Sequence, residues 1–129
     1  MAAAKMHVGF DMVLVNHIQA SVAAFGERFL RKIYTPQELD YCGHGAALKL
    51  ERLASRFAAK EAVIKALRLA EAGVRWSDIE VVKLRDGACA IACHGRVAEV
   101  VRDLGVQEIS VSMSHEADYA GACVVVQCA

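Results

Sequence analysis

Proline and aromatic residues are scarce in this chain, and its charges balance. The 129 residues include one proline, 6% aromatics, and 15 basic against 15 acidic side chains. This composition argues against a proline-rich linker or a disordered segment. The lack of net charge gives no general attraction to nucleic acid or to an acidic membrane. No apolar run approaches the roughly 18 residues of a membrane-spanning helix, so we expect neither a nucleic-acid partner nor a membrane segment.

Cysteine is present, but without the spacing of a metal site or a disulfide framework. The five cysteines are an odd number and include no C-x-x-C pair, which is typical of a reducing cytoplasm. Cys89, Cys93 and His94 match no standard zinc spacing, and a buried strand explains the two cysteines better. The first residues hold one lysine where a signal peptide has a basic region, so we expect a cytoplasmic protein.

Aliphatic residues and alanine supply most of the apolar content, which is 56% of the chain. A chain of this length fits one domain with its own core, and we predict a single domain over residues 1–129. Periodicity and turn residues predict an α+β fold. The expected strands cover residues 6–15, 78–84, 88–93, 108–113 and 119–127. The expected helices cover residues 16–32, 48–72 and 95–104, and a further helix starts in "TPQEL" (35–39) and ends at the glycines of "YCGHG".

Three local motifs predict where elements begin and end. In "TPQEL", Thr35 is a helix N-cap and Glu38 completes a capping box. Asp86 and Gly87 are typical of a hairpin turn. Gly73 is a suitable stop for the long helix.

The segment "VGFDMVLV" contains one aspartate, Asp11, inside an apolar strand. Alternation places Val8, Phe10, Met12 and Leu14 on one face, so Asp11 points away from the main apolar side. One interpretation is an exposed residue of an edge strand. The other is a metal ligand, because a carboxylate that interrupts a strand otherwise costs stability.

The helix expected over residues 48–72 carries a second acidic candidate, Glu61. Lys65 lies four residues later on the same face, with Arg56, Lys60 and Arg68 nearby. An ordinary exposed ion pair explains this spacing, and contributes about 0.3–0.5 kcal/mol. Alternatively, Glu61 binds a metal beside cations that bind phosphate.

A third group of candidates is the segment "SMSHEAD". Ser114 and His115 follow the strand expected to end at residue 113, where both side chains can donate to phosphate oxygens. Turn chemistry is the alternative, with Ser114 and Asp118 bonding to loop backbone groups. No Walker loop, G-x-G-x-x-G or G-x-S-x-G motif is present.

Together these segments resemble the 4'-phosphopantetheinyl transferases. "GFDMVLV", "ERFLRKIYTPQEL", "RFAAKEAVIKAL" and "SVSMSHEADYAGACVVV" occur in the family's order. The chain is most similar to the short holo-acyl carrier protein synthase type, over residues 7–126. The resemblance implies an antiparallel sheet packed against one long and several shorter helices. It also implies transfer of phosphopantetheine from coenzyme A to a serine of an acyl carrier protein, with release of adenosine 3',5'-bisphosphate.

The resemblance also assigns roles to individual residues. Asp11 and Glu61 match the two Mg²⁺ ligands, and Lys65 matches the lysine near the coenzyme A phosphates. Glu61, directly or through water, would take the serine proton, and Lys65 would stabilise the leaving phosphate. Three further positions match residues that line the coenzyme A site: Arg56, Ser114 and His115. The short type is similar to a homotrimer with sites between subunits, so we expect this chain to form one.

The carrier protein is expected to be acidic, which makes the basic cluster of Arg28, Arg31 and Lys32 a candidate docking face. A solvated helix end is the alternative. The family's Gly-Thr-Gly loop after "KA" is replaced by "LRLAEAG", which suggests a longer helix and altered nucleotide contacts. His17 and Leu14 also replace residues common in the family. These departures leave open a second hypothesis, a non-catalytic relative that binds coenzyme A or a carrier protein.

Overall fold

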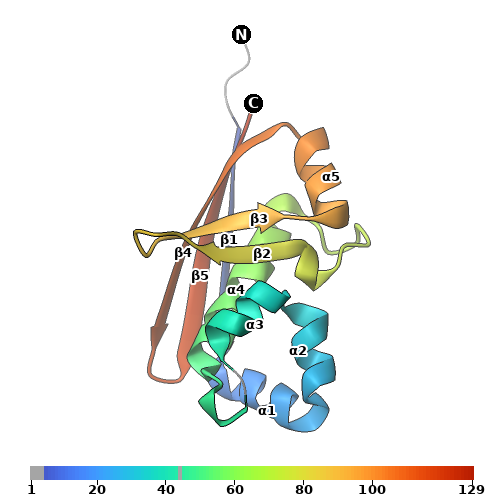
Figure 1. Cartoon of the computed structure of the whole chain (residues 1–129). Coiled ribbons are helices and arrows are strands. Elements are labelled where there is room, and N and C mark those ends of the chain that lie inside the picture. The colour runs from blue at the N-terminus through green and yellow to red at the C-terminus, as the bar shows by residue number, and fades with distance from the viewer. Residues whose placement is uncertain (1–4, 44) are drawn as a thin grey trace.

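Three long strands and one long helix form the centre of the molecule (Figure 1). The computed structural model describes residues 5–43 and 45–129. The strands are β1 (Lys5–Leu14), β2 (Ile79–Lys83), β3 (Cys89–Cys93), β4 (Val106–Glu116) and β5 (Tyr119–Cys128). The α-helices are α1 (Val15–Phe25), α2 (Glu27–Ile33), α3 (Pro36–Cys42), α4 (Leu50–Leu67) and α5 (Gly95–Asp103), with short 3₁₀ turns η1 (Gly45–Ala47) and η2 (Trp76–Asp78). The predicted α+β class is confirmed.

Two predicted helices have different boundaries in the structure. The helix expected over residues 16–32 is two helices, α1 and α2, because Gly26 interrupts it at φ 56°. The helix expected over residues 48–72 ends at Leu67, where Arg68 adopts the left-handed conformation and caps it. The prediction of a longer helix, with Gly73 as its stop, is therefore wrong.

The three long strands form one antiparallel sheet in the order β1-β5-β4. Helix α4 lies across one face of this sheet, where its alanines Ala58, Ala59, Ala62 and Ala66 are buried. Small side chains let the helix approach the strands closely. Gly9 of β1 marks the closest approach, because a Cβ there would lie 1.9 Å from the carbonyl oxygen of Ala62. The absence of a side chain at residue 9 thus determines how near β1 sits to α4.

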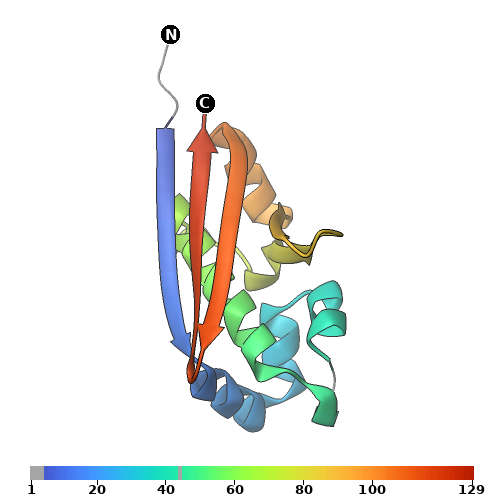
Figure 2. The same cartoon turned by 90° about the vertical axis from the view of Figure 1, so that its left-hand side faces the viewer.

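Among the described residues, no element covers the other face of the sheet, which we call the bare face (Figure 2). Val8, Phe10 and Met12 point to this side and are 67%, 57% and 55% exposed. The predicted alternation of β1 is confirmed, but its apolar side is the uncovered one. The side with Gly9 and Asp11 packs against α4.

Helices α1–α3 form a small lobe beside one end of α4, and the β2–β3 hairpin crosses in front of α4 (Figure 1). The capping box of Thr35 and Glu38 is confirmed. The hairpin turn is also as predicted, because the amide of Ala88 donates to Asp86 Oδ1 at 2.9 Å. No helix in the described residues combines the length and apolarity needed to cross a membrane.

Candidate active site

Asp11 lies on the face of β1 that meets α4, and it forms an ion pair with Lys65. The Lys65 Nζ to Asp11 Oδ1 distance is 2.9 Å, and the same ammonium donates to the carbonyl of Phe10 at 3.1 Å. The Asp11 side chain is 16% exposed and that of Lys65 is 52% exposed. Strand β1 is an edge strand, as one interpretation held, but Asp11 is largely covered. The hydrogen bond from Lys65 to Asp11 raises the pKa of Lys65, which keeps the ammonium charged.

Glu61 completes a group that we call the carboxylate cluster. It consists of the carboxylates of Asp11 and Glu61 and the ammonium of Lys65 beside them. Glu61 is half-buried on α4, one turn before Lys65. Burial raises the pKa of Glu61, and the negative charge of Asp11 raises it further, while Lys65 lowers it. The exposed Glu61–Lys65 pair expected from spacing is replaced by the pair between Lys65 and Asp11. The cluster therefore contains two carboxylates whose charges influence each other, beside one ammonium group.

This cluster has the donor set of a Mg²⁺ site that a substrate completes. Carboxylate oxygens are ligands that Mg²⁺ prefers, and two of them leave positions for water and phosphate. The described residues contain no group of three or more His, Cys, Asp or Glu side chains that could hold a metal ion. Like-charge coupling between Asp11 and Glu61 favours a cation between them, and Lys65 supplies only one positive charge. Asp11 and Glu61 therefore fit the predicted metal.

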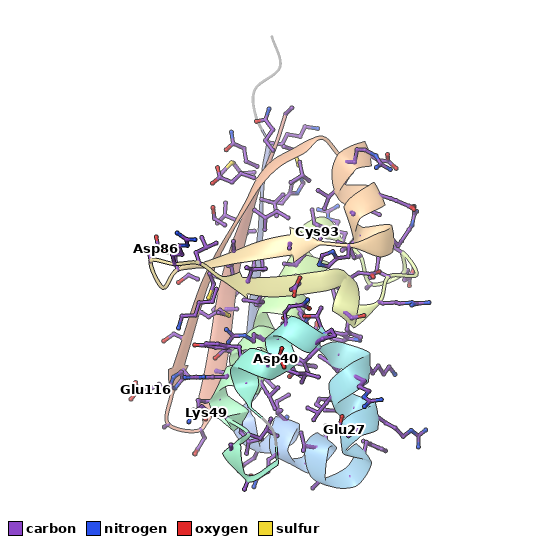
Figure 3. All side chains as sticks on the ribbon, viewed as in Figure 1. Glu27, Asp40, Lys49, Asp86, Cys93 and Glu116 are labelled. Atoms are coloured by element: carbon purple, nitrogen blue, oxygen red, sulfur yellow. The ribbon has the colours of Figure 1, made fainter. Side chains whose placement is uncertain are left out.

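The other three predicted site residues lie together in a different place. Arg56, Ser114 and His115 line one pocket of about 350 Å³, which we call the arginine pocket. The β2–β3 hairpin, with Asp86 at its tip, and β4, which ends at Glu116, approach this region (Figure 3). The expected loop at Ser114 and His115 is wrong, because β4 continues through both residues. A strand places neighbouring side chains on opposite faces. Ser114 lies in register with Gly121 and Met12, so its side chain is on the bare face of the sheet, and that of His115 is on the opposite face.

The carboxylate cluster and the arginine pocket use different faces of α4. At about 100° per residue, Arg56 and Glu61 point roughly 140° apart around the helix. Arg56 faces α3, where its guanidinium lies 4.3 Å from the ring centre of Tyr41. Glu61 instead faces β1. One chain thus presents two separated groups of predicted site residues.

Lys60, which the sequence placed among the cations near Glu61, has a different role. Its ammonium is fully buried and contacts Glu38 Oε1 at 2.7 Å. It also donates to the carbonyls of Trp76 and Ile79. Burial lowers the pKa of Lys60, an effect that Glu38 opposes. Lys60 joins α3 and β2 to α4, and is not available to bind a phosphate.

A polar chain continues from this ion pair to the surface, and sequence reasoning did not find it. Glu38 Oε2 accepts from the amide of Val81, while Thr35 Oγ1 donates to Glu80 at 2.8 Å. Glu80 also bonds to His94 Nε2 at 2.8 Å. Burial raises the pKa of Glu80, but the bonds from His94 and Thr35 outweigh it and leave the pKa lowered. The one sequence signal that pointed to this chain of polar contacts was Glu38, the glutamate of the capping box.

The predicted docking residues lie on α2 and are all exposed. Arg31 pairs with Glu27 at 3.4 Å, one turn away. Arg28 and Lys32 instead border a groove of about 400 Å³, lined by Phe25, Phe29, Ile33 and Trp76. The cluster therefore divides into one paired arginine and two cations at the rim of an apolar groove.

Known proteins match this chain over nearly its whole length. A family model described as the 4'-phosphopantetheinyl transferase superfamily matches residues 7–124. The holo-[acyl-carrier-protein] synthase of Koribacter versatilis is 42% identical over 120 residues, which is 92% of this chain and 95% of that protein. That of Dehalococcoides mccartyi is 43% identical over 122 residues, which is 95% of this chain and 98% of that protein.

Solved structures agree with the sequence relatives. Helicobacter pylori holo-[acyl-carrier-protein] synthase in complex with coenzyme A has a TM-score of 0.81 and 32% identity, covering 92% of this chain and 98% of that chain. The Chronobacterium ammoniagenes synthase–coenzyme A complex has a TM-score of 0.84 and 31% identity, covering 97% and 98%. The chain belongs to the 4'-phosphopantetheinyl transferase superfamily, as an enzyme of the holo-acyl carrier protein synthase type.

Proposed function

We propose that this chain transfers the 4'-phosphopantetheine group of coenzyme A to a serine of an apo acyl carrier protein, in a Mg²⁺-dependent reaction. The observation that carries the proposal is the carboxylate cluster. Asp11 and Glu61 come from elements fifty residues apart, and the fold brings them into electrostatic contact beside Lys65. Several relatives are named holo-[acyl-carrier-protein] synthase, and two of the similar structures contain coenzyme A.

In the proposed reaction, the serine oxygen bonds to the β-phosphorus of coenzyme A, and the bond from that phosphorus to the bridging oxygen breaks. Adenosine 3',5'-bisphosphate leaves with this oxygen. Glu61, directly or through a water, accepts the serine proton, and its raised pKa brings it closer to that task. Lys65 stabilises the charge on the leaving phosphate. Mg²⁺ held by Asp11 and Glu61 would neutralise charge on the pyrophosphate.

The arginine pocket is proposed to bind another phosphate of coenzyme A. Arg56 is 4% exposed and lines the same pocket as Ser114 and His115. Since the two groups of predicted site residues lie on different faces of α4, we infer that a complete site uses the cluster of one subunit and the pocket of another. The bare apolar face of the sheet supports a homotrimer, because exposed Val8, Phe10 and Met12 need a partner surface.

The acidic carrier protein is proposed to dock on α2. Arg28 and Lys32 would pair with its carboxylates, while the apolar groove between them receives an apolar side chain. Arg31, already paired with Glu27, should contribute less. Charge reversal at Arg28 and Lys32 should raise KM for the carrier protein and leave KM for coenzyme A unchanged. Reversal at Arg96, an exposed arginine of α5, is the matched control.

The test of the proposed function is transfer itself. Purified protein, coenzyme A, Mg²⁺ and an apo carrier protein are incubated, and the mass of the carrier is measured. We expect a phosphopantetheine adduct, lost in Asp11→Asn and Glu61→Gln and after chelation of the metal. No adduct on any of several carrier proteins, together with coenzyme A binding that does not need metal, would establish the non-catalytic alternative.

A further inference from the structure

Tyr41, on α3, holds three cations around its ring. The guanidinium carbons of Arg52 and Arg56 each lie 4.3 Å from the ring centre, and Lys83 Nζ lies 4.8 Å from it. Arg52 also donates to the Tyr41 carbonyl at 2.9 Å. Lys83 donates to the Tyr41 hydroxyl at 2.8 Å, which lowers the pKa of that hydroxyl. One side chain therefore organises cations from α4 and β2.

Among the described residues, these three cations have no acidic partner. Within the described residues, no carboxylate lies within 4.0 Å of Arg52, Arg56 or Lys83. All three line the arginine pocket, where Glu51 is the one acidic side chain among the described lining residues. Three like charges around one ring repel one another, and cation–π contacts offset only part of this cost. The arrangement is thus better suited to binding an anion than to stabilising the fold.

Arg56 provides an independent indication of a missing ligand. Its side chain is almost fully buried, yet its Nε atom has no hydrogen-bond partner. A buried donor without a partner is costly, and native proteins rarely leave one unexplained. Arg56 also lines the same pocket as His115, whose ring can donate to an anion.

We propose that Tyr41 is a positioning residue that holds Arg52, Arg56 and Lys83 in place to bind a phosphate of coenzyme A in the arginine pocket. This inference rests on the proposed function for the identity of the ligand, and adds three residues that the family resemblance did not supply. Tyr41 itself touches the cations and not the reacting atoms. Its effect should therefore fall on substrate binding and leave the chemical step unchanged.

The test compares Tyr41→Leu, which removes the ring, with Tyr41→Phe, which keeps it. We expect Tyr41→Leu to raise KM for coenzyme A about tenfold with kcat unchanged, since two or three cation–π contacts are lost. Tyr41→Phe should remain within about threefold of wild type. Calorimetric binding of adenosine 3',5'-bisphosphate, which needs no transfer, should weaken by the same factors.

Two further variants separate positioning from charge and from folding. Arg52→Ala keeps Tyr41 but removes one cation, and should also weaken bisphosphate binding several-fold. Arg96→Ala removes an equal charge outside the pocket, and should leave binding unchanged. Unchanged binding in both Tyr41→Leu and Arg52→Ala, with melting temperatures near wild type, would overturn the inference. That result leaves the proposed function standing if wild type still modifies the carrier protein.

Discussion

Gly9 offers a sharp test of how the fold brings Asp11 to α4. In Gly9→Ala, the new Cβ would lie 1.9 Å from the Ala62 carbonyl oxygen and 3.0 Å from the Ala66 amide nitrogen. Both are backbone atoms of α4, so no side-chain rotation relieves the contact. Strand β1 or helix α4 must move instead.

The size of this movement follows from the contact. A Cβ rarely comes within 3.0 Å of another heavy atom, so β1 and α4 must separate by about 1 Å. The Lys65–Asp11 bond, now 2.9 Å, then exceeds hydrogen-bond distance unless the side chains follow. Overpacking of this kind costs about 1–3 kcal/mol. Misplacing a catalytic group by 1 Å can lower activity about a hundredfold, so activity should fall further than stability.

The assay is kcat/KM for phosphopantetheine transfer, measured with the unfolding free energy in urea. Gly121→Ala is the matched control, because its Cβ would meet Asp11 O at 3.5 Å, an ordinary contact. Light scattering on both variants distinguishes a displaced strand from a lost assembly. If Gly9→Ala kept the activity and stability of wild type, the argument that residue 9 determines the Asp11–α4 distance would be wrong.

Three other predictions concern charge and assembly. Since burial and Asp11 raise the pKa of Glu61, its ionised form destabilises the metal-free fold at pH 7. Glu61→Gln should raise the metal-free Tm by roughly 1–3 °C and abolish the stabilisation by Mg²⁺. The Tm difference should shrink as the pH falls through the raised pKa of Glu61 and vanish below the ordinary glutamate value of 4.5, because the wild-type carboxyl is then neutral in both states. A constant difference would contradict this. Glu38→Ala should destabilise by about 3–5 kcal/mol in urea unfolding, because it leaves the buried Lys60 ammonium unpaired. Adding Lys60→Met should recover part of that loss, whereas strictly additive losses would show that the pair is uncoupled. Phe10→Asp should convert the proposed trimer to monomer in light scattering, since Phe10 lies on the bare face of the sheet; an unchanged mass would refute that assignment.

Local signals in the sequence predicted much of the fold. The capping box at Thr35 and the turn at Asp86 depend on contacts a few residues apart, so a short segment specifies them. The end of α4 was mispredicted because favourable helix residues continue past Leu67, yet the chain turns at Arg68. Tertiary packing there overrides local propensity.

The candidate site shows the same division. Asp11 and Glu61 were identified from an ordered set of motifs, and in the structure the charge of Asp11 is near enough to raise the pKa of Glu61. The pattern could not show that Lys60 is buried with Glu38 while Lys65, five residues later, pairs with Asp11. Helical spacing gives only relative directions around α4. Which direction meets which neighbour depends on packing.

The sequence by itself determined the family, the α+β class and the alternation of β1, because each depends on residue identity and local order. The metal role of Asp11 and Glu61 stays a prediction. Only the tertiary structure decided which face of β1 is covered, that the predicted site residues lie in two separate groups, and that Tyr41 gathers Arg52, Arg56 and Lys83. These features join residues from separate elements. Their distances are set by close packing, such as the approach of Gly9 to Ala62, and not by spacing along the chain.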